Sequence, residues 1–362
     1  EIDLPDHIDQ YDQSVYRKAK SNIEAFLSKG ILIRDEKPML YIYRQTMGKQ
    51  VQTGIVACVS IDDYLNNVIR KHELTRVEKE KDRINHFDTC NANTEPVFLT
   101  YRDRYDIRSM IDAWIKSYDP VYDIKTADGV DHTLWTVDNE TTIKSLVNLF
   151  DDISSLYIAD GHHRSASAVN VGLKRRKENP NYTGDEEFNY FLAVIFPDKD
   201  LNILDYNRIV KDLNGLTPDE FLSKISLIYD IEIRKDRYKP EGKHIISMYL
   251  DGKWYKLVAK ENIIPEDPVK RLDVSILQET ILSPILGIND PRTDNRISFV
   301  GGIRGLEELE ARVDKKTSTV AFALYPVDIE DLLTISDEGK IMPPKSTWFE
   351  PKLGSGLFIH QL

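Results

Sequence analysis

Apolar and polar positions recur along the chain with the two periods that distinguish helices from strands. Between residues 11 and 29 the apolar side chains share one face of a helix, and Gly30 follows as its C-cap. Apolar runs at residues 39–45 and 52–60 flank a turn at residues 47–49, which predicts a β-hairpin. The first part of the chain therefore combines helix and strand.

The same alternation continues along the rest of the sequence. Ser60 is the expected N-cap of a short helix. A second hairpin is expected at residues 244–259, with its turn at Asp251-Gly252. The remaining pattern predicts helices at 61–73, 75–90, 108–118, 141–153, 217–229, 274–287 and 328–336, and strands at 96–102, 132–137, 187–197 and 320–327. This order predicts a mixed α/β (α+β) protein with an extended C-terminal tail.

Composition narrows the class of protein. The chain has 362 residues, which favours two domains, and its formal net charge of -12 argues against a nucleic-acid partner. No apolar run is long enough to cross a membrane. Two cysteines cannot build a cysteine-rich zinc site, and Cys58 within an apolar run is expected to be a buried thiol. We expect a cytoplasmic protein that is a monomer or a homodimer.

The strongest candidate for chemistry lies where a strand at residues 156–158 leads through a tight turn into a helix. The turn reads Asp160-Gly161-His162-His163-Arg164. A glycine there lets the backbone approach a ligand, the helix start offers free N–H groups, and arginine adds a fork of donors. This combination suits a phosphate, and the aspartate suits Mg²⁺ or the orientation of an imidazole. A polar turn with the aspartate as an N-cap is the alternative.

Weaker signals lie in three other places. The run at residues 71–83 offers Glu73 as a general base, although a solvated helix with i, i+4 charge pairs explains the same residues. The tail at residues 343–352 supplies a lysine and two hydroxyls, which suit an anion but also suit a docked C-terminal arm. The sequence has no Walker motif, no GxGxxG after a strand, no GxSxG and no HExxH. P-loop kinases, dehydrogenases, α/β-hydrolases and zincins are therefore disfavoured.

The corner at residues 160–164, His72-Glu73 upstream and Lys345-Ser346-Thr347 near the end together resemble the free serine kinases. These are enzymes of the ParB/sulfiredoxin-like fold that phosphorylate the hydroxyl of L-serine. The segments at 71–83, 157–168, 205–215 and 342–356 also resemble a family long labelled as a domain of unknown function, whose longer members include pyrophosphate-dependent serine kinases. Members of that family usually begin before the segment EIDLP, so we expect further residues ahead of Glu1.

The resemblance implies a role for each matching residue. Glu73 would be the base that takes the serine Oγ proton, and Asp160 would assist by binding Mg²⁺ or by orienting a histidine, with His163 completing the catalytic set. The donor phosphates would be bound by Gly161, His162, His163, Arg164, Lys79, Arg83, Lys345, Ser346 and Thr347. The serine would be bound by His72, Asn207, Arg208 and Thr347.

These expectations combine into one hypothesis. A ParB/sulfiredoxin-like catalytic domain at residues 1–197 precedes a second α+β domain at 198–340, and an arm at 341–362 returns to complete the cleft. The expected activity is a pyrophosphate-dependent phosphorylation of L-serine that needs Mg²⁺ and supplies O-phosphoserine to cysteine or serine metabolism. The alternatives are ADP or ATP as the donor, or a nucleotide-binding regulator on the same fold.

Overall fold

The computed structural model describes residues 4–5 and 7–362, so the first three residues of EIDLP lie outside the described residues. The chain forms two compact units. Unit 1 comprises Glu1–Leu201 and Pro351–Leu362, and unit 2 comprises Asn202–Glu350. The boundaries expected from the sequence lie at residues 197 and 340. Each unit contains sheets and helices, which confirms the predicted mixed α/β class.

Unit 1 is built on an eight-stranded mixed sheet with the order β3-β8-β5-β9-β2-β1-β7-β6. β5 runs parallel to β9 and antiparallel to β8, and β3 runs parallel to β8. The strands are β1 (Leu40–Met47), β2 (Gln50–Ser60), β3 (Ile69–Arg70), β5 (Val97–Tyr101), β6 (Tyr122–Lys125), β7 (Val130–Val137), β8 (Leu156–Asp160) and β9 (Tyr190–Pro197). A separate short pair joins β4 (Ala92–Asn93) to β18 (His360–Gln361) near the end of the chain.

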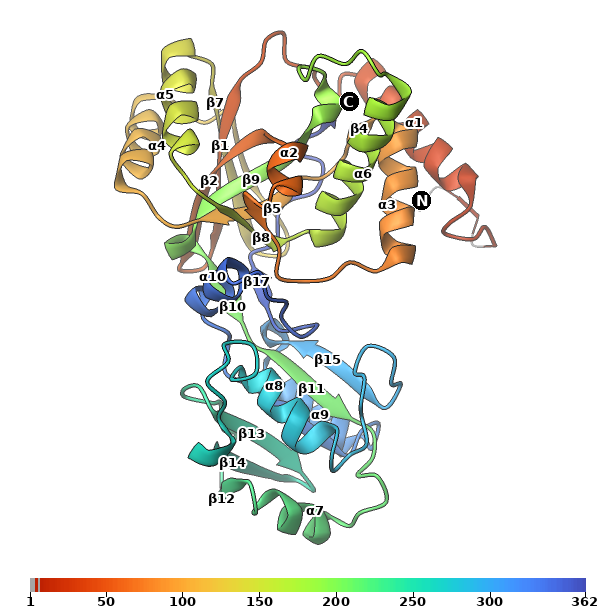
Figure 1. Cartoon of the computed structure of the whole chain (residues 1–362), viewed down its shortest axis with the longest axis vertical. Coiled ribbons are helices and arrows are strands. Elements are labelled where there is room, and N and C mark those ends of the chain that lie inside the picture. Colours follow the sequence, from red (N-terminus) through yellow and green to blue (C-terminus); the bar gives the residue numbers. More distant parts are fainter. Residues whose placement is uncertain (1–3, 6) are drawn as a thin grey trace. The chain divides into compact units, whose positions relative to one another are not determined.

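Helices cover both faces of this sheet. Figure 1 shows α4 and α5 on one side and α3 and α6 on the other. Their apolar side chains join those of the sheet in one buried cluster, because each helix presents an apolar stripe to it. The helices are α1 (Gln13–Ser28), α2 (Ile61–Leu65), α3 (Val77–Cys90), α4 (Tyr105–Ser117), α5 (Glu140–Asp151) and α6 (His162–Glu178), with single turns η1 (Glu187–Asn189) and η2 (Asp198–Asp200).

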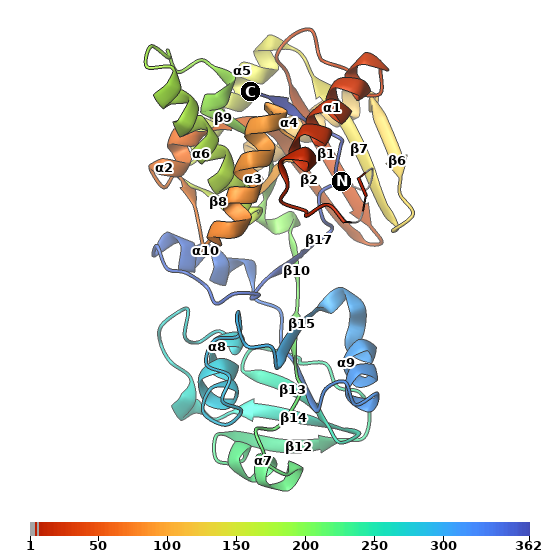
Figure 2. The ribbon, with the colours of Figure 1, turned by 90° about the vertical axis from the view of Figure 1, so that its right-hand side faces the viewer.

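Unit 2 is built on a six-stranded antiparallel sheet with the order β12-β14-β13-β16-β11-β15. Figure 2 shows β12, β14 and β13 as neighbouring arrows, and α9 packs its apolar face on this sheet. The strands are β10 (Asn202–Leu204), β11 (Tyr206–Val210), β12 (Tyr229–Arg234), β13 (Ile245–Leu250), β14 (Lys253–Ala259), β15 (Ile297–Gly301), β16 (Val320–Ala323) and β17 (Trp348–Glu350), of which β10 and β17 form a separate pair. The helical segments are α7 (Pro218–Ile225), η3 (Glu261–Ile263), α8 (Asp273–Leu277), η4 (Gln278–Leu282), η5 (Gly302–Arg304), α9 (Gly305–Asp314) and α10 (Ile329–Asp337).

Local signals in the sequence account for many of these elements. The predicted hairpin turns are confirmed at Met47–Gln50 and at Asp251-Gly252, where both residues have positive φ, as a tight two-residue turn requires. The Ser60 side chain caps α2 as predicted. Three expectations are wrong. The helix that begins at Ile61 ends at Leu65 because β3 follows, the helix expected at 274–287 becomes π-helical at η4, and Cys58 is exposed.

Within the described residues, no helix is both long and apolar enough to cross a membrane.

Candidate active site

A pair of parallel strands brings two distant segments of unit 1 together. Ile69 of β3 lies opposite Leu156 of β8, and the two strands run in the same direction. Both therefore end at the same edge of the sheet. β3 leads into Lys71-His72-Glu73, while β8 ends at Asp160 and turns into α6. The sheet thus places Glu73 and the start of α6 side by side, although the two segments are 90 residues apart.

Gly161 makes the sharp turn between β8 and α6. Its φ of 98° lies in the left-handed region, which glycine adopts without a steric penalty. The turn leaves the first N–H groups of a 17-residue helix without intrahelical acceptors. These N–H groups and the positive end of the helix dipole make this corner suitable for an anion.

Two buried histidines lie beneath the corner. The rings of His72 and His162 meet edge to face with their centroids 4.4 Å apart. The backbone N–H of His72 donates to Nε2 of His162 at 3.4 Å. Burial lowers the pKa of His72 to about 4, against a smaller opposing effect of the Asp160 charge. Burial, followed by the neighbouring His72, also lowers the pKa of His162 well below its usual value. Both rings are therefore neutral at pH 7.

The neutral His162 ring lies beside the carboxylate of Glu73. Because Nε2 of His162 accepts a hydrogen bond, its Nδ1 carries the proton. That Nδ1 lies 3.8 Å from Oε2 of Glu73. The Glu73 side chain keeps 42% of its surface exposed, so it is accessible to a substrate. An accessible carboxylate beside a fixed N–H donor is a suitable general base.

Asp160 is held between a backbone group and a lysine. Its Oδ1 accepts the Gly161 N–H at 2.7 Å, and its Oδ2 lies 2.8 Å from Nζ of Lys352. Burial acts to raise the pKa of Asp160, but the charge and hydrogen bond of Lys352 and the charge of Arg164 outweigh it and lower the pKa. Asp160 is therefore ionised at neutral pH.

Lys352 reaches this site because buried glutamines hold the chain on either side of it. Nε2 of Gln45 donates to the Lys352 carbonyl at 2.7 Å, and Nε2 of Gln52 donates to the Pro351 carbonyl at 3.4 Å. Oε1 of Gln45 accepts from Gln52 at 2.8 Å. The hairpin β1–β2 thus fixes the return of the chain into unit 1 and brings a second cation beside the corner.

The other side chains at the start of α6 are also held by their neighbours. Nε2 of His163 accepts the Arg76 N–H at 3.0 Å. Nε of Arg164 lies 3.0 Å from the Glu95 carboxylate, and its Nη1 donates to the Pro96 carbonyl at 3.0 Å. These contacts orient the guanidinium before a ligand arrives, which lowers the entropic cost of binding.

The remaining predicted residues of unit 1 lie on α3. Lys79 and Arg83 are both exposed on this helix. Their long side chains are therefore free to reorient in solvent, in contrast to the buried histidines and the tethered Arg164. The structure brings together His72, Glu73, Asp160, Gly161, His162, His163 and Arg164.

The predicted residues of unit 2 form a cluster of their own. The amide of Asn207 joins Asp205 to the Leu324 N–H, at 2.5 and 3.0 Å. Arg208 is 2% exposed, and its Nη2 donates to the Lys345 carbonyl at 2.9 Å. Burial lowers the pKa of Arg208 to about 9.

The segment at residues 345–347 lies next to this cluster. Nζ of Lys345 lies 5.5 Å from the centre of the Tyr206 ring. The Ser346 hydroxyl donates to the Pro343 carbonyl at 2.6 Å, and Thr347 is half-buried. Arg208 thus holds the backbone of this segment, and the Lys345 side chain remains exposed.

Sequence reasoning did not include Lys352 and Glu95 among the site residues. Lys352 belongs to the tail at residues 343–352 and directly follows Pro351. Its proximity to Asp160 depends on a contact between positions 192 residues apart. Glu95 precedes β5 and carried no motif. The available signal for Glu95 was a charged residue next to the end of a predicted strand. Because many charged residues occupy such positions, this signal does not single out a site residue.

A divalent cation has few protein ligands here. Among the described residues, no three His, Cys, Asp or Glu side chains gather as a metal-binding group. Mg²⁺ keeps several waters and is often held by one or two carboxylates together with substrate phosphates. The ionised Asp160 beside an anion-binding corner fits that mode of binding, in which the phosphate supplies the other ligands.

Comparison with protein families gives one match. Residues 1–275 match a family described as "Protein of unknown function (DUF1015)". The chain belongs to this family. The expected resemblance to a family of unknown function is thus confirmed for these residues, which include every residue of the corner except Lys352. No curated protein matches the chain.

Solved structures resemble this DUF1015 member distantly. A free serine kinase in complex with AMP is 11% identical, with 84% of this chain and 89% of that chain covered and a TM-score of 0.41. SbnI with a C-terminal truncation, from Staphylococcus aureus, is 10% identical, with 83% and 85% covered and a TM-score of 0.46. A conserved hypothetical protein from Pyrococcus furiosus is 13% identical, with 86% and 96% covered and a TM-score of 0.39.

Proposed function

We propose that this protein is a kinase that phosphorylates free L-serine with pyrophosphate as the donor, giving O-phospho-L-serine and orthophosphate. The observation that supports the proposal most directly is the meeting of an accessible carboxylate, Glu73, with an anion-binding helix start at Gly161. Phosphoryl transfer needs mainly a positioned base and donors that neutralise the charge of the phosphates. The sequence resemblance to free serine kinases supplies the acceptor.

In the proposed reaction, Glu73 accepts the proton of the serine hydroxyl as its Oγ attacks one phosphorus atom of pyrophosphate. The bond from that phosphorus to the bridging oxygen breaks, and orthophosphate leaves with the bridging oxygen. The Nδ1–H of His162 lies 3.8 Å from the Glu73 carboxylate, beside the group that accepts the proton. The N–H groups at the start of α6 and the side chains of Arg164 and Lys352 hold the donor phosphates.

Magnesium is part of the proposal. Asp160 is the residue that would hold Mg²⁺, and the ion would neutralise charge on the phosphates. A phosphate that takes Nζ of Lys352 leaves Oδ2 of Asp160 available to such an ion. The protein's own contribution is to keep Asp160 ionised and oriented through the Gly161 N–H.

The choice of donor rests on chemistry at the corner. Pyrophosphate needs donors for its oxygens alone, and the corner supplies backbone N–H groups and two cationic side chains. ADP or ATP would need a further apolar slot for the base. Residues around the corner that carry the resemblance are polar or charged, so we place the nucleotides second.

One assay tests both the reaction and the donor. The protein is incubated with L-serine, Mg²⁺ and, in separate samples, pyrophosphate, ADP or ATP, and O-phosphoserine is measured. Product with pyrophosphate alone is the expected result. Product with a nucleotide alone would retain the serine kinase and change its donor. No product in any sample would contradict the kinase and favour a protein that binds a nucleotide without turnover.

The base is tested with Glu73→Gln. This variant keeps the shape of the side chain and removes its capacity to accept a proton, so the rate of serine phosphorylation should fall at least a hundredfold, within the range of about 10²–10⁴ expected for general base catalysis. Binding of pyrophosphate, measured by calorimetry, should change less than about threefold because Glu73 does not hold the phosphates. An unchanged rate would reject Glu73 as the base. Glu78→Gln, on α3, is the matched control.

A further inference from the structure

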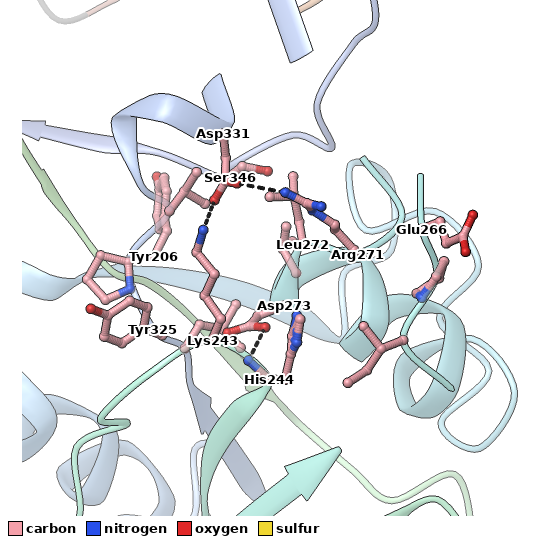
Figure 3. A pocket seen from close by; sticks show the side chains of 16 residues that line it. Tyr206, Lys243, His244, Glu266, Arg271, Leu272, Asp273, Tyr325, Asp331 and Ser346 are labelled. Atoms are coloured by element: carbon pink, nitrogen blue, oxygen red, sulfur yellow. Dashed lines mark hydrogen bonds and ion pairs between the residues drawn. The ribbon is translucent and has the colours of Figure 1, made fainter. Parts of the chain in front are cut away.

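Unit 2 contains a pocket whose lining residues all belong to this unit. Its volume is about 350 Å³, within the range of pockets that bind small molecules. Figure 3 shows Tyr206, Tyr325, Arg271 and Asp273 among the side chains around it. The apolar part of the wall is formed by Ile264, Pro265, Leu272, Val274, Leu324, Pro326 and Val327. A wall of this kind favours a ligand with an apolar portion.

The charged side chains of the wall exclude a strongly anionic ligand. Two of them are cationic and three are acidic: Lys243, Arg271, Glu266, Asp273 and Asp331. Lys243 is neutralised where it stands, because its Nζ lies 2.7 Å from both Asp328 and Asp331. A polyphosphate would meet more carboxylates than cations here. A ligand without net charge, or with one charge of each sign, suits the wall better.

Asp273 is a buried carboxylate that lacks a full set of partners. It is 9% exposed, and its Oδ1 accepts the backbone N–H of His244 at 2.7 Å. Within the part of the chain that the structure describes, its Oδ2 has no hydrogen-bond donor. Burial raises the pKa of Asp273 to about 7. A buried carboxylate of this kind is stabilised by a cationic donor, and an ammonium group is the donor that also carries the opposite charge.

Arg271 supplies the complementary group. Its Nη2 lies 3.6 Å from Oδ1 of Asp331, which is longer than a hydrogen bond, and 47% of its side chain is exposed. Figure 3 shows its guanidinium at the wall of the pocket. The remaining N–H groups are oriented as a planar fork, which matches the two oxygens of a carboxylate. In the sequence, Leu272 alone stands between Arg271 and Asp273, and its side chain is buried.

We propose that this pocket binds a free α-amino acid with a large apolar side chain. Its ammonium group would bind Asp273, its carboxylate would bind Arg271, and its side chain would contact the apolar wall. The pocket is much larger than serine requires, so the ligand is distinct from the acceptor proposed above. An effector of the protein would bind in this way. The inference is independent of the kinase activity, because binding is measured without any phosphoryl transfer.

Isothermal titration calorimetry on the full chain tests the proposal. The ligands are L-phenylalanine, L-leucine, L-serine, 3-phenylpropionate, which lacks the ammonium group, and 2-phenylethylamine, which lacks the carboxylate. We expect phenylalanine or leucine to bind at least tenfold more tightly than serine. We expect each truncated analogue to bind about tenfold or more weakly than phenylalanine, because a charge-assisted hydrogen bond is lost.

Two variants assign the two ends of the ligand. Asp273→Asn should weaken phenylalanine at least tenfold and leave 3-phenylpropionate within threefold. Arg271→Gln should weaken phenylalanine and 3-phenylpropionate and leave 2-phenylethylamine unchanged. Arg292→Gln is the matched control, since Arg292 in unit 2 is 52% exposed and also pairs with an aspartate. Circular dichroism checks that Asp273→Asn is folded, and the half-exposed Arg271 provides a test that does not depend on it.

Several results would overturn the proposal. Absence of binding by both apolar amino acids at millimolar concentration would do so. Equal affinity of phenylalanine and its two analogues would show that neither charged end is recognised, and serine binding as tightly as phenylalanine would exclude a role for the apolar wall. None of these outcomes decides whether the protein phosphorylates serine, which the assay of O-phosphoserine tests separately.

Discussion

Gln45→Leu is expected to release the segment that carries Lys352 from the hairpin β1–β2. Gln45 is fully buried, and it makes two hydrogen bonds with its side chain. Its Nε2 donates to the Lys352 carbonyl and its Oε1 accepts from Gln52. Leucine has a similar size and makes neither bond. The variant therefore leaves one carbonyl and one amide N–H without their partners in a buried place.

The cost follows from the number of groups that lose a partner. A buried polar group that is left unsatisfied costs about 1–3 kcal/mol. Two such groups destabilise the closed segment by about 2 kcal/mol or more. Since about 1.4 kcal/mol changes an equilibrium tenfold, the fraction of molecules in which residues 351–354 are detached should rise at least about 30-fold.

Amide hydrogen exchange measured by mass spectrometry detects this opening. The Gly354 N–H donates to the Tyr43 hydroxyl at 3.2 Å, so its protection depends on the closed segment. We expect exchange in residues 351–356 to accelerate at least about 30-fold in Gln45→Leu. Gln50→Leu is the control, because Gln50 belongs to the same hairpin and is half-buried, with one bond to the Asp200 carbonyl. Acceleration below threefold in Gln45→Leu would refute the tethering argument.

Three further predictions concern charged side chains. Arg164→Ala should raise the KM for pyrophosphate at least tenfold, and a KM within about twofold of wild type would remove Arg164 from the donor site. Lys352→Met should lower the free energy of unfolding by less than about 1 kcal/mol, because the Lys352–Asp160 pair is nearly half exposed. The same variant should weaken pyrophosphate binding at least tenfold. A large loss of stability in urea denaturation without weaker binding would show that Lys352 has only a structural role. The pKa of Asp273 is raised to about 7, so this group binds a proton more readily in the folded state, and its contribution to stability is lost as the pH rises from about 4 through 7. Asp273→Asn should therefore become more stable relative to wild type over that interval in urea denaturation, and a constant difference would contradict the assignment.

Local sequence patterns predicted the parts of the fold that depend on local chemistry. The turn at Asp251-Gly252 was predictable because asparagine, aspartate and glycine are the residues that tolerate positive φ at both turn positions. The passage from β8 through Gly161 into α6 was predictable for the same reason. The candidate site at Asp160–Arg164 was found because these chemically informative residues are consecutive.

Features that depend on pairing between distant segments were not predictable. β3 has two residues, too few for a period of two to be visible, and the sequence favoured a continuous helix there. Its parallel pairing with β8 nevertheless places Glu73 at the site. Cys58 looked buried because the surrounding run is apolar, but burial depends on what covers each face of the sheet. The sequence around Cys58 does not show which elements pack on each face of the sheet.

The charge of the corner also depends on tertiary structure. A count of side chains suggests a strongly cationic corner, with two histidines and an arginine in succession. Burial keeps His162 neutral, so besides Arg164 the corner relies on backbone N–H groups and on Lys352, which arrives from the far end of the chain. Lys352 and Asp160 neutralise each other until an anion arrives. In the proposed reaction the donor phosphate takes over Lys352, and the partner of Asp160 changes at the same moment. Donor binding and the availability of Asp160 to Mg²⁺ are therefore linked through the Lys352 side chain. Removal of that side chain alone separates the two.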